Sequence, residues 1–395
     1  MEKSIRFIII VGMVAAFLGA PSVASAQSAL PLYCQEGSLS SHDPQYPANQ
    51  MILVCVPPNW NGSLVMYAHG YVPEQAPLSL PAELFLEDGS LSSLVTGILY
   101  QGFAFATTSY HKNGYAVEQA RMDLNDLLNY VKKQVKPASL QKVFLVGASE
   151  GGEIAALMIE HFPDKYAGAL AMCGPIGGGQ YQVQYLSDFR AVFDYYFPGV
   201  FPFGVVDVPV NAFLNYPLTD PPAGYPLAIA LAIANNPSAT FQLYGVTGAA
   251  LDPSDPIFSP VKSAISILYY SIWGTNDLIA TAGGMPYDNQ STVYLDPGLN
   301  AGIERVDSDG RARAYMHRFY QTTGELQRPL VTLHNLYDPV VPVQHEYIYQ
   351  DLVTQTGKQG FFTSSVIPTY GHCNFSIGQI SDAFNTLVFQ AMAQP

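Results

Sequence analysis

One run of residues, 142–160, limits the possible folds of this chain more than any other. Residues 142–148 are mostly apolar and strand-like, and from Glu153 onward apolar side chains recur at helical spacing. Between the two lies Gly147-Ala148-Ser149-Glu150-Gly151, a Gly-x-Ser-x-Gly pattern. A serine on a tight turn between a strand and a helix has the position of a nucleophile, and the free N–H groups of the helix can stabilise an oxyanion. We therefore predict that Ser149 is a nucleophile; the alternative is an ordinary turn.

Strand-like and helix-like segments alternate on both sides of this run. The strand-like runs are 51–56, 63–68, 103–108, 142–148, 166–173, 329–334 and 361–367, and the helix-like runs are 91–101, 116–135, 153–160, 344–354 and 377–392. Near-continuous apolar strands that alternate with helices predict a mostly parallel sheet covered by helices on both faces. The fold class is therefore α/β.

The alternation stops between residues 176 and 327. This stretch is rich in Pro, Tyr, Phe and Gly, and it contains one helix-like piece, 227–234. We predict a core in two parts, 27–175 and 328–395, interrupted by an insertion, 176–327, that has the size of a small domain.

The first 26 residues have the pattern of a secretory signal peptide. Lys3 and Arg6 give a basic start, residues 7–18 are apolar, and Ala24-Ser25-Ala26 resembles a cleavage site before Gln27. We expect a mature protein secreted to the periplasm or the exterior, with no membrane attachment; the alternative is an uncleaved anchor.

Composition narrows the choice of partners. Hydrophobic residues make up 49% of the chain and charged residues 12%, which is typical of a globular protein with a large core. The net charge is −14, and it becomes −15 once the signal segment is removed. So acidic a chain lacks the basic surface that binds nucleic acid or anionic membranes.

An acid and a base for the serine both follow strand-like runs farther along the chain. Asp338 comes one turn after the strand at 329–334, and His372 lies in the loop after the last strand. Ligands of parallel sheets bind at the carboxyl ends of the strands, where Ser149 also lies. A base that takes the serine proton, oriented by a carboxylate, is what a serine nucleophile requires.

Other histidines are weaker candidates for the base. His334 belongs to a buried strand, which is typical of a core histidine, and His345 lies in the first turn of a helix. We expect His69 to shape the loop in which it lies, and His111 either to line the pocket or to lie in a solvated loop. Asp307-Ser308-Asp309-Gly310 lacks the later carboxylate of a calcium loop, so we predict an ordinary turn and no metal or cofactor.

The order Ser149, Asp338, His372 resembles that of the α/β-hydrolase superfamily. In particular, the chain looks like a secreted bacterial serine esterase with a large lid inserted after the sixth strand. The resemblance covers about residues 51–175 and 328–395. It implies that Ser149 is the nucleophile, His372 the general base and then acid, and Asp338 the carboxylate that orients it. It also implies an oxyanion hole formed by the N–H groups of Glu150 and, we expect, Tyr71.

Four cysteines in an exported chain predict two disulfides. Cys34 and Cys55 flank the first strands and are expected to pair. Fungal and bacterial tannases and feruloyl esterases are similar in placing a cysteine just after the catalytic histidine, but they bond it to a cysteine just before the serine, and that motif is not met here. Here Ala148 precedes the serine, so we predict a related bond between Cys173 and Cys373, at the same rim of the sheet.

The insertion is dense in aromatic side chains: Tyr195, Tyr196, Phe197, Phe201, Phe203, Tyr269, Tyr270 and Trp273. We expect most of them to form the core of the insertion and some to face the cleft. An apolar pocket favours hydrophobic or aromatic esters, small or polymeric.

Two other functions remain open. A serine peptidase on the same fold could bind a free amine through Glu304, Asp307 or Asp309. A non-catalytic protein on a hydrolase scaffold usually lacks a member of the triad, and here all three are present.

Overall fold

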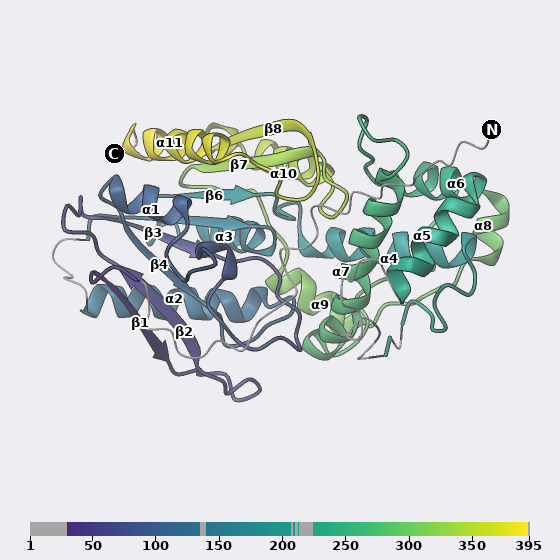
Figure 1. Cartoon of the computed structure of the whole chain (residues 1–395), viewed down its shortest axis with the longest axis horizontal. Helices are drawn as coiled ribbons and strands as arrows, with labels where there is room; N and C mark the ends of the chain where they lie inside the picture. Colours follow the sequence, from purple (N-terminus) through teal and green to yellow (C-terminus); the bar gives the residue numbers. More distant parts are fainter. Residues whose placement is uncertain (1–29, 135–139, 207, 210–211, 213–223, 394–395) are drawn as a thin grey trace, which may run out of the picture.

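The computed structural model describes residues 30–134, 140–206, 208–209, 212 and 224–393, so the predicted signal peptide lies outside the described residues. The centre is one eight-stranded sheet in the order β1-β2-β4-β3-β5-β6-β7-β8 (Figure 1). Its strands are β1 (Cys34–Leu39), β2 (Gln50–Cys55), β3 (Ser63–Ala68), β4 (Ala104–Thr108), β5 (Lys142–Ala148), β6 (Gly168–Met172), β7 (Leu330–Tyr337) and β8 (Phe362–Tyr370). β2 pairs antiparallel with both β1 and β4, and all other neighbours are parallel. The predicted mostly parallel sheet is confirmed.

Helices cover both faces of the sheet. On one face, three helices share a hydrophobic core with the central strands: α2 (Val117–Gln134), α3 (Glu150–His161) and α10 (Gln344–Gln355). On the other face α1 (Ser93–Tyr100) and α11 (Ile377–Ala393) bury apolar residues in a second core. Short 3₁₀ turns occupy Ala82–Leu84 and Gln359–Phe361. Strands buried on both sides explain the near-continuous apolar runs in the sequence.

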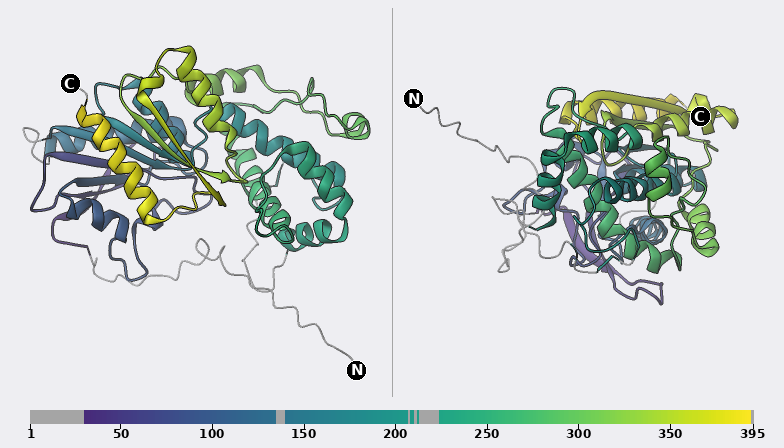
Figure 2. Two further views of the ribbon diagram at one scale, coloured as in Figure 1. Left: turned by 90° about the horizontal axis from the view of Figure 1, so that it is seen from above. Right: turned by 90° about the vertical axis from the view of Figure 1, so that its right-hand side faces the viewer.

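Between β6 and β7 the chain forms what we call the helical segment, which consists of helices α4 to α9. They are α4 (Gly179–Tyr196), α5 (Tyr225–Asn235), α6 (Pro237–Thr247), α7 (Ser259–Ala282), α8 (Pro297–Gly302) and α9 (Gly310–Phe319). Figures 1 and 2 show these helices gathered at one end of the sheet, beyond the end of β6. Buried side chains of α4, α6 and α7 are continuous with the core beneath α3.

Two sequence-based predictions of local structure were wrong. The helix after Ser149 begins at Glu150 and not at Glu153, because the turn leads directly into it. The insertion contains six helices among its described residues where one was predicted. Residues with modest helix propensity form these helices because tertiary packing stabilises them.

The first strands are joined by a disulfide between Cys34 and Cys55, which face each other in the β1–β2 register. This is the pairing expected from the sequence. Among the described residues, no helix combines the length and apolarity needed to cross a membrane.

Candidate active site

Ser149 lies on a turn whose backbone is strained. Its φ is 57° and its ψ −125°, a conformation that L-residues rarely adopt. Glycines next to it are required by close backbone contacts: a Cβ on Gly147 would collide with Gly151, and a Cβ on Gly151 would collide with the carbonyl of Ala68. The Gly-x-Ser-x-Gly pattern is therefore a steric necessity of this turn, which raises the serine hydroxyl above the end of β5.

The three predicted triad side chains form one chain of hydrogen bonds. The Oγ of Ser149 lies 2.8 Å from Nε2 of His372, and Nδ1 of that ring lies 2.7 Å from Oδ2 of Asp338. The residues are far apart in sequence, and they meet because they follow the parallel strands β5, β7 and β8 at the same edge of the sheet. This geometry can pass the serine proton to an imidazole held in one orientation.

Asp338 is fully buried and held by several donors. Its Oδ1 accepts the N–H groups of Val340 at 2.8 Å and Val341 at 3.0 Å. On its other side, Nε2 of His334 lies 3.9 Å from Oδ2. These contacts fix the position and orientation of the carboxylate beside His372.

The residues predicted to form an oxyanion hole lie beside the serine. Glu150 is the first residue of α3, and a Cβ built on Gly70 would lie 3.1 Å from Cβ of Ser149, so the loop that contains Tyr71 packs directly against the nucleophile. No hydrogen bond within the described residues uses the backbone N–H of Tyr71 or of Glu150. Both residues line the same pocket as Ser149.

This pocket holds about 720 Å³ of space, part of it open to solvent. It has two sides, which we name by their origin. The core-side wall comes from loops at the strand ends and consists of Tyr71, Tyr115, Ser149, Glu150, Pro175, Val340 and Val341. The helical wall comes from α4, α7 and the loop after α7, and consists of Gln182, Val183, Leu186, Ser187, Tyr270, Ser271, Gly274, Thr275, Leu278, Met285 and Pro286.

Of the eight aromatic residues singled out in the insertion, one, Tyr270, lines the pocket, and its ring centroid lies 6.3 Å from that of His372. Phe197 and Phe201 are buried in the core of the helical segment. The sequence did not single out Tyr115 or Gln182. Tyr115 could have been found from its place in the loop after a parallel strand, whereas the position of Gln182 had no signal in the sequence.

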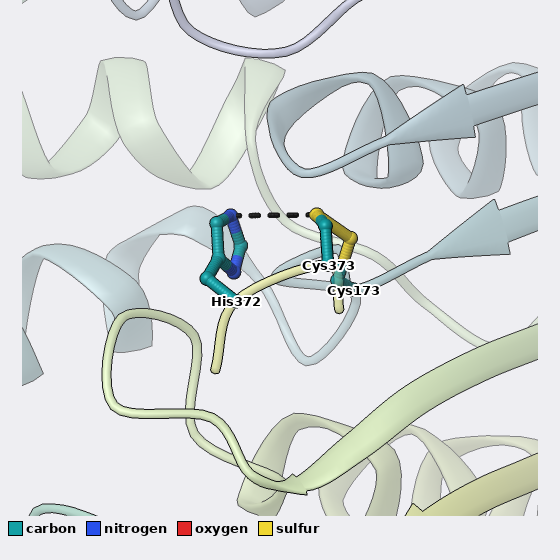
Figure 3. Close-up of side chains that lie close together, drawn as sticks. All are labelled: Cys173, His372 and Cys373. Carbon is teal, nitrogen blue, oxygen red and sulfur yellow. Dashed lines mark hydrogen bonds between the residues drawn. A yellow bond between two sulfur atoms is a disulfide. The ribbon is translucent and has the colours of Figure 1, made fainter. Parts of the chain in front are cut away.

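A disulfide joins Cys173 to Cys373 next to the triad, the pairing expected from the sequence. Figure 3 shows the imidazole of His372 beside it, with Sγ of Cys373 3.6 Å from Nε2. Both cysteines have positive φ, 47° and 54°. The bond ties the histidine loop to the end of β6. Because the two sulfur atoms are bonded to each other, they are not thiolate ligands for a metal.

The other histidines have structural surroundings. Burial lowers the pKa of His69, which stacks on Tyr110 with ring centroids 3.9 Å apart. Burial also holds the pKa of His345 well below its usual value; this ring bonds to Gly177 and Gln182.

His111 is neither in the pocket nor in a solvated loop, so both expectations for it were wrong. It is buried, and its Nδ1 lies 2.7 Å from the carboxylate of Asp123. The carboxylate partner within α2 holds the histidine inside the protein.

The acidic residues considered for amine binding do not line the pocket. Glu304 accepts the N–H of Val205 at 3.2 Å, and Asp309 caps the first turn of α9. Asp307 is exposed. The Asp307–Gly310 stretch is the N-terminus of α9, with Asp309 as its cap and Gly310 as its first residue, and not the ordinary turn predicted from the sequence.

A buried ion pair connects the two walls of the pocket. Lys112, in the loop after β4, pairs with Asp277 of α7, and both side chains are almost completely inaccessible to solvent. The other carboxylate oxygen of Asp277 accepts the N–H of Tyr115 at 2.7 Å. The ion pair and this hydrogen bond anchor α7 to the core.

Comparison with known proteins adds to this description. No protein-family model matches the chain. The o-phthalyl amidase of Xanthobacter agilis is 27% identical over 128 residues, which are 30% of this chain and 27% of that enzyme. Human lysosomal Pro-X carboxypeptidase is 37% identical over 68 residues, 17% of this chain and 14% of that enzyme. The chain therefore spans about a quarter or less of the length of these curated relatives.

Among solved structures, feruloyl esterase B from Aspergillus oryzae superposes with a TM-score of 0.54 at 14% identity, covering 86% of this chain and 74% of that one. With this strand order and this likeness, the chain has the fold of the α/β-hydrolase superfamily, as the sequence predicts.

Proposed function

We propose that this protein is a serine hydrolase that cleaves carboxylic esters through an acyl-enzyme. The observation that carries the proposal is the hydrogen-bonded chain from Ser149 through His372 to buried Asp338. A serine hydroxyl on a strained turn, with an oriented imidazole at 2.8 Å, is the arrangement that nucleophilic catalysis requires.

In the proposed mechanism, Nε2 of His372 takes the proton of Ser149 as Oγ attacks the ester carbonyl. The resulting imidazolium gives that proton to the departing alcohol oxygen, which leaves an acyl-serine. His372 then takes a proton from water, the hydroxide attacks the acyl-serine, and the proton returns to Oγ. Asp338 keeps its charge throughout and holds the Nδ1–H tautomer.

The negative oxygen of each tetrahedral intermediate would lie between the N–H groups of Tyr71 and Glu150. Neither group has another partner within the described residues, so both are available without breaking a bond. Each such donor typically contributes about 3–4 kcal/mol of transition-state stabilisation.

The lining of the pocket supports hydrophobic or aromatic esters as substrates. Its helical wall is largely apolar, with Val183, Leu186, Leu278, Met285 and Pro286. Apolar lining with few polar groups is typical of sites that bind hydrophobic small molecules. We therefore propose that the helical segment is the lid of this site.

A serine peptidase or amidase on the same fold is the second candidate. It is favoured by the amidase and carboxypeptidase that share part of this sequence. The absence of Glu304, Asp307 and Asp309 from the pocket lining weighs against amine binding through those residues.

The signal pattern at residues 1–26 and two disulfides among the described residues support export from the cytoplasm. Sequencing the N-terminus of protein from an exporting host tests this, and we expect it to begin at Gln27. An intact N-terminus would contradict cleavage.

The decisive experiment is turnover of short- and medium-chain p-nitrophenyl esters by the mature protein, beside Ser149→Ala and a panel of amino-acid p-nitroanilides. We expect ester turnover that Ser149→Ala abolishes. Anilide turnover without ester turnover would favour the peptidase. If neither substrate reacts and a fluorophosphonate does not label Ser149, the hydrolase proposal is wrong.

A further inference from the structure

We propose that the pocket contains a second binding element, in which the Glu150 carboxyl and the Tyr71 hydroxyl hold an oxygen acceptor of the substrate, such as the carbonyl of another ester or amide group. We call this pair the acceptor subsite. It rests on the proposed esterase function and specifies the substrate class: esters that carry a second, neutral carbonyl group close to the one that is cleaved.

The first argument is that both polar groups are buried and incompletely paired. The side chain of Glu150 is 4% exposed; its Oε1 accepts the N–H of Ala116 at 2.7 Å, but its Oε2 has no partner among the described residues. The hydroxyl of Tyr71 is also buried without a partner there. Buried polar atoms are normally hydrogen-bonded, so two exceptions at one site need an explanation. Since both residues line the pocket beside Ser149, a bound substrate can supply the missing partner.

The second argument concerns which proton each group carries. Burial raises the pKa of Glu150 to about 8, so the side chain is mostly a neutral acid at pH 7. Because Oε1 already accepts an N–H, the acid proton lies on Oε2. Burial, together with the charges of Asp277 and Glu150, also raises the pKa of Tyr71 well above its usual value. The subsite therefore presents two O–H donors.

Two neutral donors select for an acceptor. Lys112 is the cation near Glu150, and it is engaged by Asp277, which leaves no unpaired positive charge in this part of the described structure for a carboxylate. To pair with a ligand ammonium, Glu150 would have to lose its proton, and both its burial and the charge of Asp277 oppose that loss. A neutral carbonyl oxygen requires no change of charge.

The third argument is position. Glu150 directly follows the nucleophile, and the ring of Tyr71 packs edge-on against Tyr270 at 5.7 Å between centroids. Tyr270 in turn contacts His372. The acceptor subsite is thus next to the reacting atoms. The second carbonyl of the substrate must therefore lie only a few bonds from the ester that is cleaved, in either its acyl or its alcohol part.

The experiment compares pairs of p-nitrophenyl esters. In each pair, one ester has a plain alkanoyl chain. The other has an acyl chain of matched length that ends in a methyl ester, namely a monomethyl succinate, glutarate or adipate. A parallel set of phenyl butyrates, with or without a methoxycarbonyl substituent on the ring, tests the alcohol side. We expect kcat/KM to favour an acceptor-bearing member by about tenfold, the effect of one ordinary hydrogen bond.

Variants assign the preference to the two side chains. Tyr71→Phe and Glu150→Leu should remove it, mainly through KM, whereas Glu150→Gln keeps an N–H donor and should retain most of it. The matched control is Glu160→Gln, farther along α3, which is also buried but bonds to Thr323, Gly324 and Tyr349, none of which lines the pocket. It should leave the preference unchanged. If Glu150→Leu does not fold, Tyr71→Phe and Glu150→Gln still decide the question.

Several outcomes would overturn the acceptor subsite. Equal kcat/KM for every pair would do so while the esterase proposal stands. So would a preference for an ester with a terminal ammonium that Glu150→Gln abolishes, because Glu150 would then act as a carboxylate. If the protein cleaves no ester and a fluorophosphonate leaves Ser149 unlabelled, both proposals fail together.

Discussion

The core-side wall and the helical wall enclose the same pocket but are built on different principles. Ser149, Asp338 and His372 stand on loops whose conformation is fixed by backbone contacts and hydrogen bonds at the ends of parallel strands. The helical wall consists of side chains on α4, α7 and the loop after α7, and hydrophobic packing holds its helices in place. We therefore expect substitutions in the hydrogen-bonded chain of Ser149, His372 and Asp338 to change the rate of the reaction, and those on the helical wall to change which chain length of ester reacts.

The largest expected effect is on the core side. Asp338→Asn should lower kcat by about 10⁴, because the amide holds the wrong tautomer of His372 while the geometry persists. Ester turnover and circular dichroism of the variant test this. The control is Asp382→Asn, an exposed residue on α11 that should have no effect. A fall of less than tenfold in Asp338→Asn would mean that another group orients the imidazole.

The two disulfides allow the next comparison. Replacing Cys173 and Cys373 with alanine should lower stability by about 5 kcal/mol, because the bond closes a loop of 200 residues, and should lower kcat about 10- to 100-fold through a displaced histidine loop.

The matched control is removal of the Cys34–Cys55 bond, which spans 21 residues. It should cost about 3 kcal/mol without changing kcat. Urea unfolding and ester kinetics measure both variants. Equal loss of kcat in the two would show that the bond beside His372 has no special role in the site.

Glu150→Gln tests a core-side residue that affects stability more than rate. The unfolded chain releases the Glu150 proton near its usual pKa of 4.5, whereas the folded protein keeps it until about pH 8. The stability due to this group is complete below pH 4.5 and is lost as the pH rises through 8. Glutamine does not ionise, so the variant should gain up to a few kcal/mol at pH 8 and almost nothing near pH 4.5. Urea unfolding curves of the variant and the parent protein at pH 4.5 and pH 8 measure this gain. A gain that is the same at both pH values would contradict the raised pKa of Glu150.

The smallest effect should come from the helical wall. Leu186→Ala or Leu278→Ala enlarges the pocket, so the ratio of kcat/KM for medium- over short-chain esters should rise about tenfold, the scale of one or two methylenes. The kcat for the short ester should hardly change. Leu227→Ala, at an exposed site on α5, serves as control. A large fall in kcat with no change in preference would erase the distinction between the walls.

The same distinction explains how much could be predicted from the sequence. The turn at Ser149 is readable because Gly147 and Gly151 are dictated by backbone contacts, which leave a fixed pattern. Asp338 and His372 were predicted because parallel strands bring their carboxyl ends to one edge. These residues gather as predicted; their catalytic roles stay predictions.

The helical wall had no such signal. α7 (Ser259–Ala282) includes Tyr269, Tyr270, Trp273 and Gly274, residues of modest or low helix propensity, and it forms because tertiary contacts stabilise it. Glu150 is a further case, since its sequence position is that of the variable residue in the Gly-x-Ser-x-Gly pattern. It is buried and bonds to the N–H of Ala116, which is distant in sequence, and its Oε2 has no partner among the residues that the structure describes.

The ion pair between Lys112 and Asp277 has a consequence for the conditions in which the protein can work. At 0.1 M salt, dissolved ions largely screen the interaction between exposed charges that lie more than about 10 Å apart. They screen a buried ion pair much less. Both partners here are almost wholly inaccessible. Because this ion pair holds α7 against the core, the distance between the two walls should not depend on the salt concentration. We expect the pocket to keep its shape in dilute buffer and in concentrated salt.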